Sequence, residues 1–330
     1  MPARIVISAD GKKAFESWRP AFASVVPQVS VCSWYDPAYT AGEDDYALVW
    51  SPRPEHMQRL ACMKGIVCTG AGVDHLLAHA DFPRHVPLVR MGGEQTARLM
   101  ADYVLWAVIG LLRDARTWAM QQQQGLWRNN VCSRTSNTAR VGIRGLGHLG
   151  AYVAQALAHV GFCVSGWKRT PAELDGVTVW SGVEALPDFL GELDVLVNLL
   201  PATPATDGLI DHVLLSHLPK GAGFVNVGRG RHVVQSDLLR ALDDGTLCGA
   251  VLDVVTPEPL PEDSALWHHP RLTITPHVAS EASREVQARS VAAVVACLVR
   301  RDKPALLFAV PRGYRSFYSS NRHWPGYVPV

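Results

Sequence analysis

The sequence predicts an α/β protein built from two doubly wound parallel sheets, and three observations carry that prediction. The chain has 330 residues, whereas a single domain usually has ~100–200, so we expect two domains that each bury a core. Short β-branched runs alternate with amphipathic segments from the start of the chain, which is typical of a parallel sheet with helices on both faces. The same alternation starts again at Arg140, after a long helical segment, and predicts the second sheet.

The first series predicts strands at residues 4–8, 29–34, 46–50, 65–69 and 86–90. The segment that follows, residues 94–123, has no Pro and a single Gly, and its apolar residues recur at helical spacing. We therefore expect one long helix that leaves the first domain.

The second series predicts strands at residues 140–143, 163–167, 178–180, 195–199, 223–227, 250–254 and 272–274. Residues 279–300 are then expected to form a helix with Val291, Val294, Val295 and Leu298 on one face. This helix should return the chain to the first domain, which would make that domain discontinuous. We predict a first domain at residues 1–97 and 285–330 and a second at residues 98–284.

A glycine motif, Gly145-Leu-Gly147-His-Leu-Gly150, lies between the first strand of the second series and a helical segment, residues 149–160. In this setting the first glycine permits a tight turn, the second lets the backbone approach a pyrophosphate, and the third lets helix and strand pack closely. The phosphate would meet the helix N-terminus at His148 and Leu149. A glycine turn without a ligand is the alternative, and the strand–turn–helix context favours a dinucleotide.

The next strand ends in Trp167-Lys168-Arg169-Thr170, which indicates the type of dinucleotide. NAD enzymes carry Asp or Glu about 20 residues after the glycines to bind the ribose 2′-hydroxyl, and no acid stands here. Two cations and a hydroxyl fit a 2′-phosphate through charge-assisted hydrogen bonds. We therefore predict NADPH as the cofactor, with NADH weaker; a solvated basic turn is the alternative.

Three residues with complementary chemistry follow strands of the second predicted sheet: Arg229, Glu258 and His277. Ligands of such sheets bind outside the carboxyl ends of the strands, so these side chains should meet at one edge. A guanidinium can hold a carboxylate bidentately, and a carboxylate beside an imidazole favours its protonated form. Each alone would more often be an ordinary loop residue, but together with a dinucleotide they suit hydride transfer to a carbonyl acid.

The chain resembles the D-isomer-specific 2-hydroxyacid dehydrogenases, and within them it is similar to the A-type glyoxylate/hydroxypyruvate reductases. The resemblance implies two Rossmann-like or flavodoxin-like domains, the first for the substrate and the second for the dinucleotide. The resembling segments span nearly the whole chain: Asp45-Tyr-Ala-Leu-Val-Trp50, Gly70-Ala-Gly-Val-Asp74, Gly145 to Gly150, Trp167 to Thr170, Asn198-Leu-Leu-Pro201, Asn226 to Gly230, Leu252-Asp253, Glu258-Pro-Leu-Pro261, Leu266 to Arg271 and Thr275-Pro-His-Val-Ala279.

By this resemblance His277 would be the acid/base, Glu258 its partner and Arg229 the clamp for the substrate. The backbone of one loop would bind the substrate carboxylate and an indole would line the pocket. The residues implied for these two roles are Ala71, Gly72 and Val73 in the loop and Trp50 in the pocket.

The resemblance also implies cofactor contacts beyond the glycine motif. Asp253 would hold the nicotinamide amide, and the other contacts are expected at Leu200, Pro201, Val227 and Gly228. The implied activity is the NADPH-dependent reduction of small 2-oxo acids, glyoxylate and hydroxypyruvate, by a homodimer. Two alternatives use the same fold. Formate or phosphite oxidation would not need a proton donor paired in this way, and a non-catalytic dinucleotide-sensing scaffold would need none of the three residues.

The sequence departs from the family at several places. Arg144 precedes the first glycine, where an apolar residue is usual, and we expect its side chain to point to solvent rather than to contact a phosphate. Leu99-Met-Ala-Asp102 replaces a more polar segment. The tail from Arg315 to Val330 extends past the usual end of the family, and no role is assigned to it.

Composition argues against several classes of protein. The net charge is +1 without a basic block, so no nucleic-acid partner is expected, and the seven scattered Cys are typical of reduced thiols in the cytoplasm. The N-terminus lacks the pattern of a signal peptide, and the longest apolar stretch is about half of the ~20 residues of a membrane span. His75 and His79 lack the Glu of a zinc motif, and His268-His269 lack a third ligand, so no metal is expected.

Overall fold

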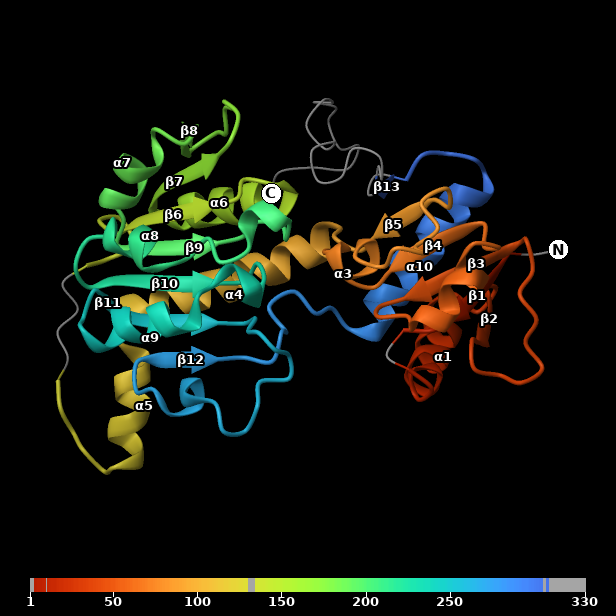
Figure 1. Cartoon of the computed structure of the whole chain (residues 1–330), viewed down its shortest axis with the longest axis horizontal. Helices are drawn as coiled ribbons and strands as arrows, with labels where there is room; N and C mark the ends of the chain where they lie inside the picture. The colour runs from red at the N-terminus through yellow and green to blue at the C-terminus, as the bar shows by residue number, and fades with distance from the viewer. Residues whose placement is uncertain (1–2, 10, 130–133, 305–306, 309–330) are drawn as a thin grey trace. The chain divides into compact units, whose positions relative to one another are not determined.

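The computed structural model describes residues 3–9, 11–129, 134–304 and 307–308. The chain divides into two compact units, which Figure 1 draws with a sheet in each. Unit 1 combines the segment up to Gly93 with the segment that begins at Ser283, and unit 2 is Glu94–Ala282. The tail from Arg315 to Val330 lies outside the described residues.

The sheet of unit 1 has the strand order β13-β5-β4-β3-β1-β2 in the described residues. Its parallel strands are β1 (Arg4–Ile7), β2 (Ser30–Ser33), β3 (Asp45–Val49), β4 (Gly65–Cys68) and β5 (Leu88–Arg90). Counted along the chain, this is the doubly wound order 2-1-3-4-5 of flavodoxin-like sheets. The two-residue strand β13 (Leu307–Phe308) pairs antiparallel with β5; it was not predicted, because two residues carry no periodicity.

Two long helices pack together in unit 1: α1 (Ala14–Val25) and α10 (Arg284–Val299). Trp18 and Phe22 of α1 are buried in one core cluster with Val291 and Val295 of α10. The remaining helical turns are η1 (Pro54–His56), α2 (Met57–Leu60) and α3 (Asp74–Leu77). The prediction that helix begins at residue 279 was wrong: Ser283 caps α10 by accepting a hydrogen bond from the Val286 N–H, and residues 279–282 belong to a loop.

The sheet of unit 2 has the strand order β12-β11-β10-β9-β6-β7-β8, and all of its described pairs are parallel. This is a Rossmann-like doubly wound sheet, whose strand order reverses between β6 and β9. Such a switch point is where ligands bind, outside the carboxyl ends of the strands. The strands are β6 (Arg140–Arg144), β7 (Cys163–Lys168), β8 (Thr178–Ser181), β9 (Val195–Asn198), β10 (Ala222–Asn226), β11 (Leu247–Leu252) and β12 (Leu272–Ile274).

Helices cover both faces of this sheet (Figure 1). The long helices α4 (Glu94–Leu112) and α6 (His148–Val160) share a core cluster with Val141 and Ile143 of the central strand. The opposite face packs Phe224 against α7 (Leu186–Gly191), α8 (His212–Ser216) and α9 (Gln235–Asp243). Short turns complete the unit: η2 (Pro204–Thr206), η3 (Gly230–His232) and η4 (Ala265–His268).

The prediction of one helix over residues 94–123 was wrong. The chain forms α4 and then α5 (Ala115–Gln123), separated at Asp114, whose φ of 55° is left-handed. Asp tolerates this conformation better than most residues, so the turn breaks the helix without the Gly or Pro that would mark it in the sequence.

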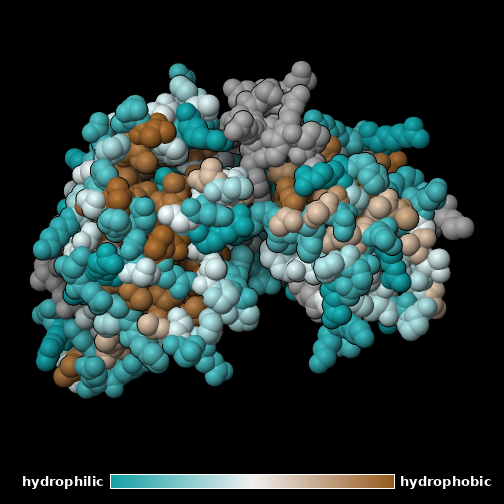
Figure 2. Space-filling view, viewed as in Figure 1, coloured by the Kyte–Doolittle hydropathy of each residue, from teal (hydrophilic) through white to brown (hydrophobic). Residues whose placement is uncertain are grey.

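The viewed surface is mainly hydrophilic, as Figure 2 shows. Hydrophobic residues are visible on unit 2 near α7 and α8, where Val183 and Val213 are exposed. Within the described part of the chain, no helix is both long enough and apolar enough to cross a membrane.

Candidate functional site

The glycine motif forms the turn between β6 and α6, at the switch point of the unit 2 sheet. Gly145 has a φ of +111°, and a Cβ there would stand 2.8 Å from the carbonyl carbon and oxygen of Leu199. A Cβ on Gly150 would overlap the carbonyl oxygen of Gly145, so the helix packs directly on the turn. Both positions therefore require glycine.

The second glycine of the motif, Gly147, serves a different purpose. Gly147 is the N-cap of α6 and offers no side-chain cap, and a Cβ built on it would meet nothing within 4 Å. The first turn of α6, at His148 and Leu149, thus presents backbone N–H groups beside open space. This is the arrangement that binds a phosphate at a helix N-terminus, and it fits a dinucleotide.

The residues predicted to select the dinucleotide separate into two groups. Lys168 ends β7, and Arg169 and Thr170 follow it as exposed residues. Burial lowers the pKa of the Lys168 ammonium. Trp167 instead lies in the apolar core, where its indole donates a hydrogen bond of 2.8 Å to the Gly182 carbonyl. The polar surface at this strand end therefore consists of the three residues after Trp167, two of them cationic.

Arg144 does not point to solvent, and that prediction was wrong. The side chain lies on a face of β6 that packs against the core, and only 2% of the residue is exposed. Its guanidinium lies over the Trp167 ring at 5.5 Å, while Nε and Nη1 have no hydrogen-bond partner among the described residues. Burial lowers the pKa of Arg144 to about 10, so the group is still charged at neutral pH, and no described carboxylate forms an ion pair with it.

The three candidate catalytic residues follow neighbouring strands at one edge of the sheet. Arg229 comes after β10, Glu258 after β11 and His277 after β12. A Cβ on Gly230 would overlap the backbone of Val255, so the loops after β10 and β11 touch only because this residue is glycine. The close approach brings Arg229 near enough for its charge to act on Glu258.

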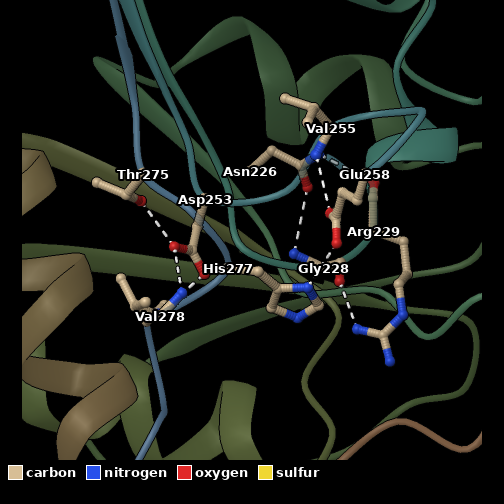
Figure 3. A network of polar contacts seen from close by, with 10 residues as sticks. Asn226, Gly228, Arg229, Asp253, Val255, Glu258, Thr275, His277 and Val278 are labelled. Carbon is tan, nitrogen blue, oxygen red and sulfur yellow. Dashed lines mark hydrogen bonds and ion pairs between the residues drawn. The ribbon is translucent and has the colours of Figure 1, made fainter. Parts of the chain in front are cut away.

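His277 and Glu258 form an ion pair, as Figure 3 shows. The distance from His277 Nδ1 to Glu258 Oε2 is 2.9 Å, and Glu258 Oε1 accepts from the Val255 N–H at 3.1 Å. Burial raises the pKa of the Glu258 carboxyl, but the hydrogen bond and charge of His277, the Val255 N–H and the charge of Arg229 outweigh burial and lower it. With Nδ1 on the carboxylate, Nε2 is the ring nitrogen that can transfer a proton to a substrate.

A buried polar network shapes the turn that carries Arg229. Asn226 Oδ1 accepts from the Gly228 N–H at 3.2 Å, and Asn226 Nδ2 donates to the Arg229 carbonyl at 3.0 Å. Asn198 Nδ2 lies 2.9 Å from Asn226 Oδ1 and 3.0 Å from His232 Nδ1. These three side chains were not predicted as site residues, although an Asn at the end of an apolar strand is a usable signal.

Asp253 is 3% exposed and holds the turn of His277. Its Oδ1 accepts from the Thr275 hydroxyl at 2.6 Å and the Val278 N–H at 2.9 Å, and its Oδ2 accepts from the Ala279 N–H at 2.9 Å (Figure 3). The other predicted cofactor contacts lie in the loops after the neighbouring strands, Leu200 and Pro201 after β9 and Val227 and Gly228 after β10.

In unit 1 the predicted carboxylate loop follows β4. The Arg90 Nη1 donates to the Ala71 carbonyl at 2.9 Å, which fixes the loop beside Gly72, while the Val73 side chain is buried in the core. The Trp50 ring packs 4.3 Å from the His75 ring, and a Cβ on Gly70 would overlap the indole. In the part of the chain that the structure describes, no group of three or more His, Cys, Asp or Glu is arranged so that it could hold a metal ion.

Comparison with known proteins gives consistent matches. Residues 105–279 match the sequence model described as D-isomer specific 2-hydroxyacid dehydrogenase, NAD binding domain. Glyoxylate/hydroxypyruvate reductase A of Serratia proteamaculans is 38% identical over 307 residues, which cover 91% of this chain and 96% of the relative.

Two solved structures are similar over almost the whole chain. A D-isomer specific 2-hydroxyacid dehydrogenase from Xanthobacter autotrophicus, in complex with NADPH and MES, is 36% identical with a TM-score of 0.85, covering 95% of this chain and 99% of that one. The NADPH-dependent glyoxylate/hydroxypyruvate reductase of Sinorhizobium meliloti, in complex with NADP and sulfate, is 32% identical with a TM-score of 0.85, covering 94% and 99%.

The buried charge of Arg144 leads to a prediction about stability. Replacing it by an apolar side chain removes a buried cation whose Nε and Nη1 have no hydrogen-bond partner among the described residues, and the lost stacking on Trp167 offsets only part of that gain. We expect Arg144→Leu to raise the free energy of unfolding by roughly 1–2 kcal/mol in urea denaturation at pH 7. Arg140→Leu, at the exposed start of the same strand, is the control and should change it by less than about 0.5 kcal/mol. A destabilised Arg144→Leu would contradict the prediction.

Proposed function

Because the chain belongs to the D-isomer specific 2-hydroxyacid dehydrogenase family, we propose that it catalyses the NADPH-dependent reduction of small 2-oxo acids, glyoxylate and hydroxypyruvate. The observation that carries this proposal is the 2.9 Å pair of His277 and Glu258, next to Arg229, on the sheet edge that also holds the glycine turn. The names of the relatives support the substrate, and the NADPH and NADP in the two solved structures support the cofactor.

The chain's residues have distinct tasks in this reaction. Arg229 holds the substrate carboxylate and polarises the neighbouring carbonyl, which positions the acid and stabilises the negative charge that develops on its oxygen. The bound NADPH supplies the hydride for the carbonyl carbon. His277 gives its Nε2 proton to the developing alkoxide, so that the product is a 2-hydroxy acid. Glu258 orients the imidazole through Nδ1 and balances its positive charge.

The proposed cofactor-binding residues of unit 2 lie in the loops at the same edge of the sheet. The pyrophosphate would be held by Gly145, Gly147, His148, Leu149 and Gly150, and the 2′-phosphate by Lys168, Arg169 and Thr170, with Trp167 supporting them from the core. Asp253 would serve the nicotinamide end, with Leu200, Pro201, Val227 and Gly228 as flanking contacts. In unit 1, Trp50, Ala71, Gly72 and Val73 would bind the substrate.

The two alternative functions lack such support. Formate or phosphite oxidation releases no alkoxide that must be protonated, and a dinucleotide sensor needs neither a proton donor nor a carboxylate clamp. The His277–Glu258 pair, whose side chains are 35% and 38% exposed, supports a reaction in which a proton is transferred to the substrate.

The charge at the end of β7 predicts the cofactor preference. A hydrogen bond to a charged group contributes roughly 1.5–3 kcal/mol, so Arg169→Ala should reduce the preference for NADPH over NADH at least about tenfold. The measurement is kcat/KM for both cofactors in the native protein and the variant. Arg53→Ala, an exposed arginine of unit 1, is the control. Equal use of both cofactors by the native protein would disprove the assignment of the 2′-phosphate site.

The size of Trp50 predicts the substrate range. An indole in the pocket leaves little room beyond a small acid, and overpacking costs typically 1–3 kcal/mol, so phenylpyruvate should have a kcat/KM roughly 5- to 150-fold below that of glyoxylate and hydroxypyruvate. A neutral aldehyde should be poor at any size, because Arg229 requires a carboxylate. NADPH consumption across these four compounds is the measurement. A preference for phenylpyruvate would overturn the small pocket, and efficient aldehyde turnover would overturn the clamp.

The same assay needs a variant that separates chemistry from binding. His277→Asn keeps the size and polarity of the side chain but removes the proton donor. It should lower kcat by roughly 10²–10⁴ and leave the NADPH Kd nearly unchanged. Near-native turnover in this variant would show that His277 is not the acid.

We also propose that the protein forms a homodimer in the cytoplasm. Large apolar side chains are exposed along α4, α5 and the residues after them: Trp106, Ile109, Trp118, Leu126 and Trp127. A cavity of about 700 Å³, lined in part by Trp106 and Leu111, lies beside them and could receive side chains of a second copy. None of the described cysteines forms a disulfide, which suits a reducing compartment.

The homodimer proposal predicts a mass of two chains by light scattering after gel filtration. Ile109→Glu should shift that mass towards one chain, because it places a charge in the apolar face. Val160→Glu, an exposed apolar residue of α6, is the control and should leave the mass unchanged. A native protein with the mass of one chain would refute the dimer.

A further inference from the structure

The turn that carries His277 has an unusual backbone. His277 has a φ of 58°, in the left-handed region that residues other than Gly rarely adopt. A residue keeps such a conformation only when its surroundings determine it, and here the His277 N–H donates to the carbonyls of Asp253 at 2.9 Å and Thr275 at 3.0 Å. The direction of the imidazole therefore depends on the group that anchors this turn.

That anchor is the Asp253 carboxylate. It accepts the backbone N–H groups of Val278 and Ala279, the two residues directly after His277, each at 2.9 Å. The carboxylate is buried, so its negative charge depends on every donor that it receives. Its third donor is the Thr275 hydroxyl at 2.6 Å.

The contact between Tyr103 and Thr275 extends this anchor to α4. Their hydroxyl oxygens are 2.5 Å apart. A threonine hydroxyl has one proton, and Thr275 directs it to Asp253, which cannot donate while it is ionised. Tyr103 must therefore be the donor in its contact with Thr275. Burial raises the pKa of Tyr103 to about 12, so the phenol keeps this proton across the neutral range.

We infer that Tyr103 is a positioning residue for His277, acting through Thr275 and Asp253 on the turn that aims the imidazole. The three side chains form a one-way series of hydrogen bonds from the phenol to the carboxylate, and each donor polarises the next. α4 is a 19-residue helix packed into the core of unit 2, so the series ties the turn to a rigid element. The expected effect of Tyr103 on kcat rests on the proposed function. Its expected effect on the backbone turn at His277 does not.

The enzymatic test compares Tyr103→Phe, Thr275→Val and Thr275→Ser. We expect Tyr103→Phe and Thr275→Val to lower kcat roughly 3- to 15-fold, while the KM for glyoxylate and the NADPH Kd change less than about twofold. Thr275→Ser retains the hydroxyl and should be near native. The double variant Tyr103→Phe/Thr275→Val should be no slower than Thr275→Val alone, because the series is already broken.

The matched control is Tyr46→Phe, which also removes a buried phenol hydroxyl. Tyr46 lies in unit 1, and its hydroxyl has no hydrogen-bond partner among the described residues. Its turnover should be near native. A Tyr103→Phe variant with native kcat, or a double variant whose losses multiply, would overturn the inference.

Amide hydrogen exchange tests the effect of Tyr103 on the backbone turn at His277 without measuring enzyme activity. Tyr103→Phe should speed exchange at Val278 and Ala279 at least about threefold, with no change at the glycine turn of α6. If the native protein reduced no 2-oxo acid, the proposed function would fail, and this measurement would still decide the role of Tyr103. Unchanged exchange at both amides would refute that role.

Discussion

The edge of unit 2 that carries His277 depends on the buried carboxylate of Asp253. It receives two consecutive backbone N–H groups and one hydroxyl, and these bonds hold the left-handed turn at His277. A buried charge without a cationic partner is tolerated only when hydrogen bonds replace its lost hydration. The hydrogen bonds that stabilise the buried carboxylate are therefore the ones that fix the backbone turn at His277. The same contacts thus stabilise the fold and orient the imidazole.

A second constraint is the close approach of backbone segments at this edge. Gly145 lies against the backbone of Leu199, Gly150 lies against Gly145, and Gly230 lies against Val255. Each contact excludes a Cβ. The first and third join the loops of neighbouring strands, and the second packs α6 onto its own turn. The absence of side chains at these three points lets the dinucleotide turn and the loops of Arg229 and Glu258 converge on the carboxyl ends of one sheet.

The charged side chains differ between the two ends of this sheet edge. At the end of β7, Lys168 and Arg169 place two cationic side chains, whereas at β11 the Glu258 carboxylate is paired with His277 and lies near Arg229. Arg144 adds a further buried cation between these regions, stacked on Trp167. The cationic surface and the buried guanidinium lie on adjacent strands, so the field at the proposed 2′-phosphate site includes a charge that solvent screens little.

The sequence alone determined the class of the fold, the glycine turn, the lack of Asp or Glu in the strand end from Trp167 to Thr170, and the order of Arg229, Glu258 and His277. These features depend on local periodicity and on residue types at strand ends. The tertiary structure decided what depends on neighbours distant in the chain. Asp114 breaks the predicted helix through a single φ, and β13 exists only because β5 offers it an edge. Arg144 is buried because the β6 pleat turns it toward Trp167, and Tyr103 meets Thr275 across 172 residues. Burial and hydrogen-bond partners are properties of packed surfaces, which a linear pattern of residue types does not encode.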